Sequence, residues 1–395
     1  MRCLWLTLAD PDPPLSGQSV YSGGLIRSFA DTGAEILVLG LCSPTGSPRH
    51  GERDGNILWH IPEGRELPRW TSMVSALPHM ANRCRTKNMR AALGACLEEA
   101  EWDAIVFDSI SAAWALPAIR RRFDGARKKP RIAYVSHNHE SSLRRSLADN
   151  RTNFVMRQAH RLDAVKTERL ESALVESANL VTAITEQDGQ RYRARWPGKR
   201  VEVLPPGYSG RSLPERQITS AVPRRAIIVG SFDWVAKRMN LEEFLHVADP
   251  IFARQGIELK VVGAGDRSYF DHLQSRLSAT RFTGTVDHIE NFIDDARIAV
   301  LPERIGGGFK LKLLEYVFNR IPVLGLKGSV AGTPLREESD VLLYANQAEL
   351  ARGVSRMIDD LKLLNRLQNA AYAICCHAFD WKSRGRSFMN ALGST

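Results

Sequence analysis

Three glycines, Gly306, Gly307 and Gly308, lead into an apolar, helix-like segment whose first turn carries two lysines, Lys310 and Lys312. A helix N-terminus is the positive end of the peptide dipole, so two cations there are unfavourable unless an anion neutralises them. Glycines let a ligand approach backbone amides closely, and together with the helix start they form an anion-binding site. The segment therefore predicts a site for a phosphate-bearing ligand; the alternative is that both lysines point into solvent. A P-loop is excluded, because the Gly-Lys-Ser/Thr ending is missing.

Short runs of Val, Ile and Leu, separated by helix-length segments, predict the elements that position this site. In the first half the runs are CLWLTL (3–8), EILVLGL (35–41), AIVFD (104–108), RIAYVS (131–136) and LVTAIT (180–185). After a Pro- and Ser-containing seam at 205–222, the pattern restarts with RAIIVGS (225–231), ELKVVGAG (258–265), IAVLP (298–302) and IPVLGL (321–326). Such runs indicate parallel strands covered on both faces. The predicted fold class is α/β with two doubly wound domains, ligands at the carboxyl ends of the strands, and a substrate in the cleft between the domains.

Length and composition indicate a globular protein of two domains. The chain has 395 residues, of which 44% are hydrophobic and 25% charged, and a chain of this length usually forms more than one core.

No apolar run approaches the roughly 18 residues of a membrane span. The N-terminal MRCLWLTLADPDPP is expected to be a strand, since it lacks the features of a signal peptide. The cysteines, expected to be reduced, show no metal-type spacing and are Cys3, Cys42, Cys84, Cys96, Cys375 and Cys376. We expect a cytoplasmic protein.

The net charge of +10 is concentrated in the first half of the chain. The basic clusters are 83–90, 120–131, 142–146 and 160–169. They indicate an anionic partner, which could be a nucleic acid, a membrane surface or a phosphorylated substrate; a solvated basic surface is the alternative. Aromatic residues do not interleave with these clusters, which argues against nucleic acid.

The glycine–lysine segment resembles the donor-site motif of GT-B glycosyltransferases of the "group 1" class, which is family 4-like and mostly retaining. Further segments resemble the family in the expected order: the glycine-containing loop around 13–40, VSHNHESSLRR, LVTAITEQD, VEVLPPG, VGSFDW, VVGAGD, FTGTVDHIENFIDDARIAVLP and FDWKSRGRSFMNAL. The resemblance implies two Rossmann-like doubly wound domains that face each other across a cleft. Residues 1–207 would form the acceptor-side domain and 208–378 the nucleotide-sugar-binding domain. Residues 379–395 would be a helix that crosses back to the first domain.

The resemblance also implies a role for Glu315, which corresponds to the second glutamate of the family's E-x7-E motif. That glutamate binds the ribose hydroxyls, as a carboxylate can by accepting from both hydroxyls of a diol; an exposed helix glutamate is the alternative. The chain departs from the motif at its first glutamate, where it has Gly307, and Lys310 replaces a common glycine. Glu303 lies nearby but at the wrong spacing for that glutamate.

Four further residues take roles from the resemblance. Lys237 lies near the place of a family residue that binds the donor phosphates, and the neighbouring Arg238 could do the same, since its planar guanidinium suits phosphate. Gly17 corresponds to the loop beside the acceptor and the donor phosphate. His137 follows a buried-type strand and corresponds to a histidine near the transferred sugar; His139 competes with it for this role.

The function that these features predict is sugar transfer from a nucleotide-sugar donor, UDP- or GDP-linked, to a lipid-linked or cell-surface saccharide acceptor. The resemblance implies that the reaction is retaining. We expect it to need no metal or other cofactor, because the lysines would stabilise the diphosphate leaving group. The basic N-terminal domain would contact an anionic membrane surface, on the inner face of the plasma membrane in polysaccharide biosynthesis.

Two other classes of function stay open at this point. A nicotinamide-dependent oxidoreductase would share the doubly wound sheets, but Gly263 and Gly265 lack the third glycine of the dinucleotide-binding motif. A basic nucleic-acid-binding protein would explain the charge but not the ordered motifs, so we expect no nucleic-acid partner.

Overall fold

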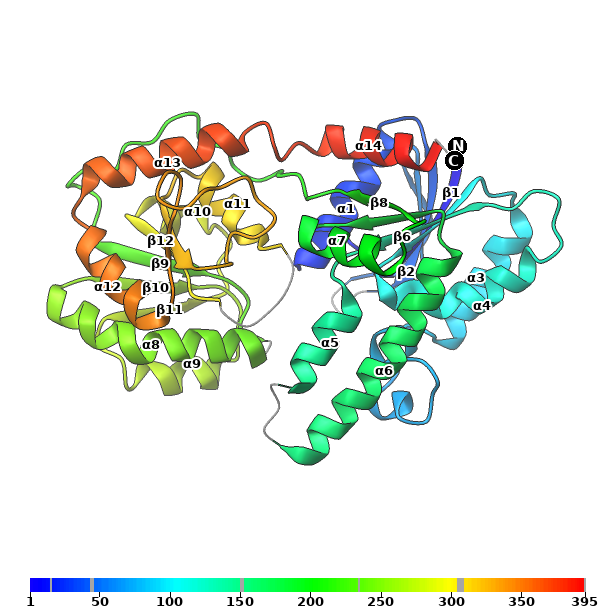
Figure 1. Cartoon of the computed structure of the whole chain (residues 1–395), viewed down its shortest axis with the longest axis horizontal. Helices are drawn as coiled ribbons and strands as arrows, with labels where there is room; N and C mark the ends of the chain where they lie inside the picture. The colour runs from blue at the N-terminus through cyan, green and yellow to red at the C-terminus, as the bar shows by residue number, and fades with distance from the viewer. Residues whose placement is uncertain (15, 43–45, 150–152, 234, 304–308, 394–395) are drawn as a thin grey trace. The chain divides into compact units, whose positions relative to one another are not determined.

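The computed structural model describes residues 1–14, 16–42, 46–149, 153–233, 235–303 and 309–393. The chain divides into two compact units (Figure 1): unit 1 is Met1–Gly207 with Trp381–Thr395, and unit 2 is Tyr208–Asp380. Each unit has a sheet of mainly parallel strands with helices on both faces. The predicted α/β fold class with two doubly wound sheets is therefore confirmed. Within the described residues, no helix has both the length and the apolar character needed to cross a bilayer.

Unit 1 is built on an eight-stranded sheet with the order β3-β4-β2-β1-β5-β6-β7-β8, in which only the β3–β4 pair is antiparallel among the described strands. The strands are β1 (Arg2–Ala9), β2 (Glu35–Leu41), β3 (Arg49–Asp54), β4 (Ile57–Ile61), β5 (Ala104–Asp108), β6 (Arg131–Ser136), β7 (Leu180–Ala183) and β8 (Arg200–Val203). The helices are α1 (Gly17–Ala30), η1 (Arg69–Ser72), α2 (His79–Asn82), α3 (Lys87–Glu99), η2 (Ile110–Ala115), α4 (Leu116–Arg122), α5 (Glu140–Asp149), α6 (Phe154–Ser177), α7 (Glu186–Arg195) and α14 (Trp381–Gly393).

The C-terminal helix α14 belongs to unit 1, where it packs on α1 (Figure 1). A Cβ on Gly385 would lie 1.9 Å from the carbonyl oxygen of Ser28, so the two helices approach too closely for any larger residue there. Beside this contact the ring of Phe388 lies 5.6 Å from Trp5 of β1 and 5.0 Å from Phe29 of α1. Burial of these rings fixes the last helix to the first strand and the first helix.

Unit 2 is built on a six-stranded, all-parallel sheet with the order β11-β10-β9-β12-β13-β14. The strands are β9 (Arg225–Val229), β10 (Glu258–Val262), β11 (Thr280–Gly284), β12 (Ile298–Leu301), β13 (Val323–Leu326) and β14 (Leu342–Tyr344). The helices are α8 (Val235–Gln255), α9 (Arg267–Gln274), α10 (Glu290–Asp294), α11 (Leu311–Phe318), α12 (Gln347–Met357) and α13 (Leu361–Cys375).

Both faces of the unit 2 sheet are apolar, as a parallel sheet between two helix layers requires. In β9, Ala226 and Ile228 join the core formed with α8 and α12, whereas Ile227 joins the core formed with α11 and α13. This alternation is the period of two that a strand imposes on its side chains. It explains why β9 is apolar from Ala226 to Val229.

In each sheet the strand order reverses at one pair of neighbouring strands among those described: β1 and β5 in unit 1, and β9 and β12 in unit 2. The loops that leave the carboxyl ends of such a pair diverge to opposite sides of the sheet, which leaves a crevice where ligands bind. The candidate site residues follow these strands.

Candidate functional site

The two predicted lysines lie at the start of α11, close to the carboxyl ends of β9 and β12. Lys310 is the N-cap residue, its side chain makes no capping hydrogen bond, and α11 begins at Leu311. The expectation that both lysines lie in the first turn of the helix is therefore wrong for Lys310, whose φ and ψ of −96° and 89° are non-helical. Lys312 is the second residue of the helix. Neither lysine is exposed, so the solvent-facing alternative does not hold.

Lys312 forms an ion pair with Glu303, which lies two residues beyond the end of β12. The Lys312 and Glu303 side chains are only 19% and 14% exposed. Desolvation, and then the nearby cations Lys312 and Lys237, lower the pKa of the Lys310 ammonium, while Glu303 opposes the shift. Desolvation and then Lys312 likewise lower the pKa of Lys237. Three lysines thus lie near Glu303, and Asp233 also acts on Lys237. We call Lys237, Lys310, Lys312 and Glu303 the lysine cluster.

The lysine cluster should bind a diphosphate with uptake of protons. A bound dianion favours the ammonium form, whereas in the free protein the pKa values of Lys237 and Lys310 lie below the usual value of about 10.4. Affinity for a nucleoside diphosphate should therefore fall as the pH rises through these lowered pKa values. Calorimetry at pH about 9 in two buffers of different ionisation enthalpy measures this uptake. Equal heats in the two buffers would contradict it.

Arg238 is held by contacts of its own, which separates it from its neighbour Lys237. Its Nε donates to the carbonyl oxygen of Phe232 at 2.6 Å, and its guanidinium lies over the ring of Tyr269 at 4.7 Å. Lys237 is exposed at the start of α8 and lies within electrostatic reach of Lys312. Of the two predicted phosphate ligands, the geometry favours Lys237.

Glu315 lies one turn into α11 and is half-buried, so it is not the exposed helix glutamate of the alternative. Asn319 Nδ2 donates to Glu315 Oε1 and to the Glu315 carbonyl oxygen, at 2.9 Å each. Burial raises the pKa of the Glu315 carboxyl; hydrogen bonding by the Tyr208 hydroxyl opposes the shift. A carboxylate has about four lone-pair positions, so Glu315 can accept hydrogen bonds from a ligand in addition to those from Asn319 and Tyr208.

Glu315→Ala should weaken nucleoside diphosphate binding by about 1–3 kcal/mol, the range of hydrogen bonds to a charged group. The fold should survive, because Asn319 keeps its bond to the backbone carbonyl of residue 315. Burial raises the pKa of Glu315 above the ordinary glutamate pKa of about 4.3. As the pH is lowered, the wild-type protein should therefore lose affinity for the nucleoside diphosphate at a higher pH than it would with an ordinary glutamate at this position. Titration calorimetry measures both effects. An unchanged dissociation constant with an intact fold would reject the ribose-binding role.

The predicted glycines Gly306, Gly307 and Gly308 lie outside the described residues. The departure from the E-x7-E motif at Gly307 therefore stays a statement about the sequence. The described residues on either side of this segment are Glu303 and Phe309.

In unit 1, His137 follows β6 and lies against the end of β5. Its Nε2 is 2.6 Å from Oδ1 of Asp108, and the other oxygen of Asp108 accepts from Trp5 Nε1 at 2.9 Å. Asp108 is fully buried and His137 is 8% exposed. The ring of Tyr21 packs edge-on against the imidazole at 5.2 Å. Asp108 therefore fixes the orientation of the ring and leaves Nδ1 as the nitrogen that can meet a ligand.

His139, the competing histidine, is engaged at the start of α5. Its Nδ1 accepts from the Ser142 hydroxyl at 2.8 Å, and its ring lies 4.8 Å from that of Tyr192. The buried carboxylate of Glu171 accepts from the backbone amides of Glu140 and Ser141, at 3.0 Å each, and so caps the same helix. These contacts give His139 a structural role.

Gly17 is the first residue of α1, at the switch point between β1 and β5. The Ser16 side chain accepts from the Ser19 amide, and the Ser19 side chain accepts from the Ser16 amide, so the helix start is fixed by its cap. Gln18 Nε2 donates to the Ser109 hydroxyl, directly after β5, at 3.4 Å. Gly17 is exposed. The first turn of α1 thus lies on the same edge of the sheet as Asp108.

The pair Gly263 and Gly265 is explained by packing. Gly263 has φ of 131°, and a Cβ there would lie 1.9 Å from the carbonyl oxygen of Gly230. A Cβ on Gly265 would meet the ring of Phe270 at 2.3 Å. Gly263 lets the loop after β10 approach the loop after β9, and Gly265 leaves room for the Phe270 ring. This packing accounts for both glycines without a bound dinucleotide.

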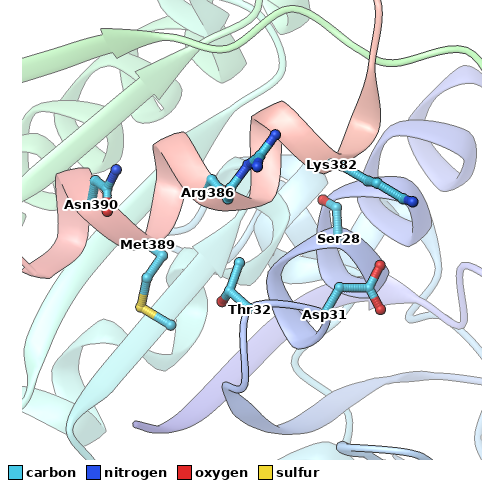
Figure 2. A pocket seen from close by; sticks show the side chains of 7 residues that line it. All are labelled: Ser28, Asp31, Thr32, Lys382, Arg386, Met389 and Asn390. Atoms are coloured by element: carbon cyan, nitrogen blue, oxygen red, sulfur yellow. The ribbon is translucent and has the colours of Figure 1, made fainter.

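A pocket of about 760 Å³ lies apart from all of the predicted residues, between the end of α1 and α14 (Figure 2). Its lining residues are Ser28, Asp31, Thr32, Lys382, Arg386, Met389 and Asn390. Two cations and one carboxylate share this pocket, so its charge favours no single class of ligand.

Two residues of the candidate site were not predicted for it. Asp108 was predicted only as the last residue of a strand, and Glu303 was set aside on its spacing. The available signal was a carboxylate at or just after the end of a buried strand: Asp108 is the last residue of β5, and Glu303 lies two residues beyond β12. Among the described residues, no group of three or more His, Cys, Asp or Glu could hold a metal ion.

Comparison with known proteins identifies both units. Residues 16–207 match the family model described as a glycosyl transferase 4-like domain, and residues 223–360 match the model described as glycosyl transferases group 1. Among curated proteins, none matches the chain by sequence.

Several solved structures resemble the whole chain. Sucrose-phosphate synthase from Thermosynechococcus elongatus has a TM-score of 0.75 at 16% identity, with 100% of this chain and 98% of that chain covered. WaaG, a glycosyltransferase involved in lipopolysaccharide biosynthesis, has a TM-score of 0.68 at 15% identity, with both chains fully covered. Anabaena HepE in complex with UDP and glucose has a TM-score of 0.66 at 13% identity, also with both chains fully covered. At these identities the likeness shows a shared fold.

Proposed function

Because the chain belongs to the group 1 glycosyltransferases and has their GT-B fold, we propose that it transfers a sugar from a UDP- or GDP-linked donor to a lipid-linked or cell-surface saccharide. The lysine cluster at the switch point of unit 2 is the observation that carries the proposal. Three lysines outnumber the two nearby carboxylates, Glu303 and Asp233, so they form a site for an anion, and a donor diphosphate supplies one. The HepE structure, which holds UDP and glucose, supports UDP as the first nucleotide to test.

The lysines would act mainly on the leaving group. When the bond between the sugar and the diphosphate breaks, negative charge grows on the diphosphate, and cations that are already in place stabilise it without reorganisation. Lys310 and Lys312, with the first amides of α11, would supply this stabilisation without a metal or another cofactor. Binding must displace Glu303 from Lys312. Retention of configuration is proposed from the family resemblance, since no carboxylate is assigned as nucleophile.

Glu315 would accept hydrogen bonds from the ribose hydroxyls, and Lys237 would add a third cation for the phosphates. His137, held by Asp108, would meet the transferred sugar or the acceptor through Nδ1. Gly17, at the start of α1, would lie beside the acceptor and the donor phosphate. Apart from Gly17, these assignments place the donor contacts in unit 2 and the acceptor contacts in unit 1.

We place the reaction at the cytoplasmic face of an anionic membrane. The basic clusters of unit 1 support this, because each Lys or Arg near an anionic leaflet contributes about 1 kcal/mol. The likeness to WaaG, a protein of lipopolysaccharide biosynthesis, supports an acceptor in surface polysaccharide assembly. Family membership leaves no support for an oxidoreductase, and the proposal includes no nucleic-acid partner.

The proposal is tested with radiolabelled UDP-glucose and GDP-mannose and a bacterial lipid extract as acceptor. We expect label in the organic phase with one of the two donors, and release of the matching nucleoside diphosphate. A thermal shift with UDP or GDP, and none with NAD or an oligonucleotide, is expected in parallel. A shift with NAD alone would overturn the proposal.

A further inference from the structure

Exposed apolar side chains are concentrated in one part of unit 1. Of the ten large apolar residues that are exposed among the described residues, eight belong to two segments, 70–74 and 154–165. They are Trp70, Met73, Val74, Phe154, Val155, Met156, Leu162 and Val165. The exposed fractions are high: Val74 is 85% exposed and Val155 74%. A soluble protein rarely exposes such a group of side chains unless the surface binds something.

The two segments are joined into one surface by hydrogen bonds. The Lys166 ammonium, in the middle of α6, donates to the carbonyl oxygens of Ser72 at 2.8 Å and Ser75 at 2.7 Å. One turn away, Asp163 accepts from the backbone amide of His79 at 2.7 Å. The segment that carries Trp70, Met73 and Val74 is thus fixed beside the part of α6 that carries Leu162 and Val165. We call these exposed residues of 70–74 and 154–165 the apolar face.

On α6 the apolar residues occupy the side away from the rest of unit 1. Val155, Leu162 and Val165 are seven and three residues apart, so they share one side of the helix. The buried residues Ala164 and Thr167 lie on the opposite side. In Figure 1 the N-terminal half of α6 extends beyond the sheet of unit 1. Val155, Leu162 and Val165 on this helix are 74%, 51% and 45% exposed.

Arginines surround the apolar face. Residues 65–90 contain six Lys or Arg and one Glu, and Arg69, beside Trp70, is exposed. On α6, Arg161 and Arg169 are exposed, and the Arg157 guanidinium lies 5.6 Å from the centre of the Phe154 ring. An apolar centre with a cationic rim is complementary to a bilayer interface, where the apolar residues enter and the cations remain at the headgroups. A second copy of this chain would bring two arginine rims together, and their charges would repel.

We propose that the apolar face inserts into the interface of an anionic lipid bilayer. Trp70, Val74, Phe154 and Val155 would enter the acyl boundary, and the surrounding arginines would contact the anionic headgroups. The biological role of this contact rests on the proposed function: membrane binding would bring unit 1 to a lipid-linked saccharide acceptor. Binding itself requires neither donor nor catalysis.

The test is co-sedimentation of the full chain with vesicles of phosphatidylcholine alone and with added phosphatidylglycerol. One variant combines Trp70→Gln, Val74→Thr, Phe154→Gln and Val155→Thr. The matched control is Met239→Gln, which removes an exposed apolar residue of unit 2 that is 47% exposed. A third variant, Arg69→Gln with Arg169→Gln, removes charge only.

We expect the wild type and the control to bind the anionic vesicles equally, and the apolar variant to bind about tenfold or more weakly, because the buried CH₂ groups are lost. The charge variant should bind more weakly and with a smaller dependence on salt. Thermal melting confirms that each variant is folded. Equal binding by the apolar variant and the wild type would overturn the inference, as would a dimer, seen by sedimentation velocity, that the apolar variant abolishes. Sugar transfer to a water-soluble acceptor is measured separately, so loss of the proposed function is distinguished from loss of membrane binding.

Discussion

Lys310→Gln combined with Lys312→Gln should weaken nucleoside diphosphate binding by about 2–4 kcal/mol, the scale of two charge-assisted hydrogen bonds. Nucleoside binding should be nearly unchanged, because these lysines would contact the phosphates and not the ribose or base. The turnover number should fall further than binding, by about a hundredfold to a thousandfold, since charge on the leaving group grows in the transition state. Titration calorimetry with the nucleoside and its diphosphate, together with steady-state kinetics, separates these effects.

Two control variants sharpen this prediction. Lys327→Gln removes a cation of unit 2 that is 63% exposed and pairs at 3.7 Å with Glu337, so it should leave binding unchanged. Glu303→Gln removes the carboxylate that competes with the phosphates for Lys312, so it should not weaken diphosphate binding. Loss of Lys312 leaves the mostly buried Glu303 unpaired, so the double variant should melt at a lower temperature than Lys310→Gln alone. If the double variant binds nucleoside diphosphate and turns over at the wild-type level, the lysines have only a structural role.

His137→Gln should lower the rate of sugar transfer by about 10²–10³-fold, the range for loss of one positioned hydrogen-bonding group that acts in the transition state. Glutamine can still donate to Asp108, so the fully buried carboxylate keeps a second partner besides Trp5. Donor binding should change little, because the donor contacts are proposed for unit 2. Single-turnover kinetics and donor titration measure the two quantities separately.

His139→Gln is the comparison for this variant. Because the His139 ring accepts from Ser142 and packs on Tyr192, its loss should lower the melting temperature more than the turnover of the folded fraction. If His137→Gln turns over at the wild-type rate, the assignment of His137 to the transferred sugar is wrong.

Nine of the fourteen described strands could be predicted from the sequence, and β3, β4, β8, β11 and β14 were not predicted. All nine predicted runs form strands, because a strand buried on both faces must be apolar along its length. β3 was missed because its residues Arg49–Asp54 are almost all exposed and polar at the edge of the sheet. β14 was missed because it has only three residues.

The lysines of the site could be predicted, and their partners could not. Lys310 and Lys312 break a local rule of helix charge, and that violation is visible in the sequence. The pairing of Lys312 with Glu303 depends on α11 starting close to the end of β12, and no spacing rule states this. The contact between Asp108 and His137 depends on β5 and β6 being neighbours in register, with Asp108 opposite Val135. Strand order is a property of the whole sheet, so neither contact is visible in a local pattern.

The most direct test of the central claim, that the lysine cluster holds the donor diphosphate, is a crystal structure of the protein with UDP bound. We predict that the β-phosphate lies within hydrogen-bond distance of the Lys310 or Lys312 ammonium, that Lys312 has left Glu303, and that the ribose hydroxyls donate to Glu315. A structure in which UDP is bound elsewhere, with Lys312 still paired to Glu303, would contradict the claim.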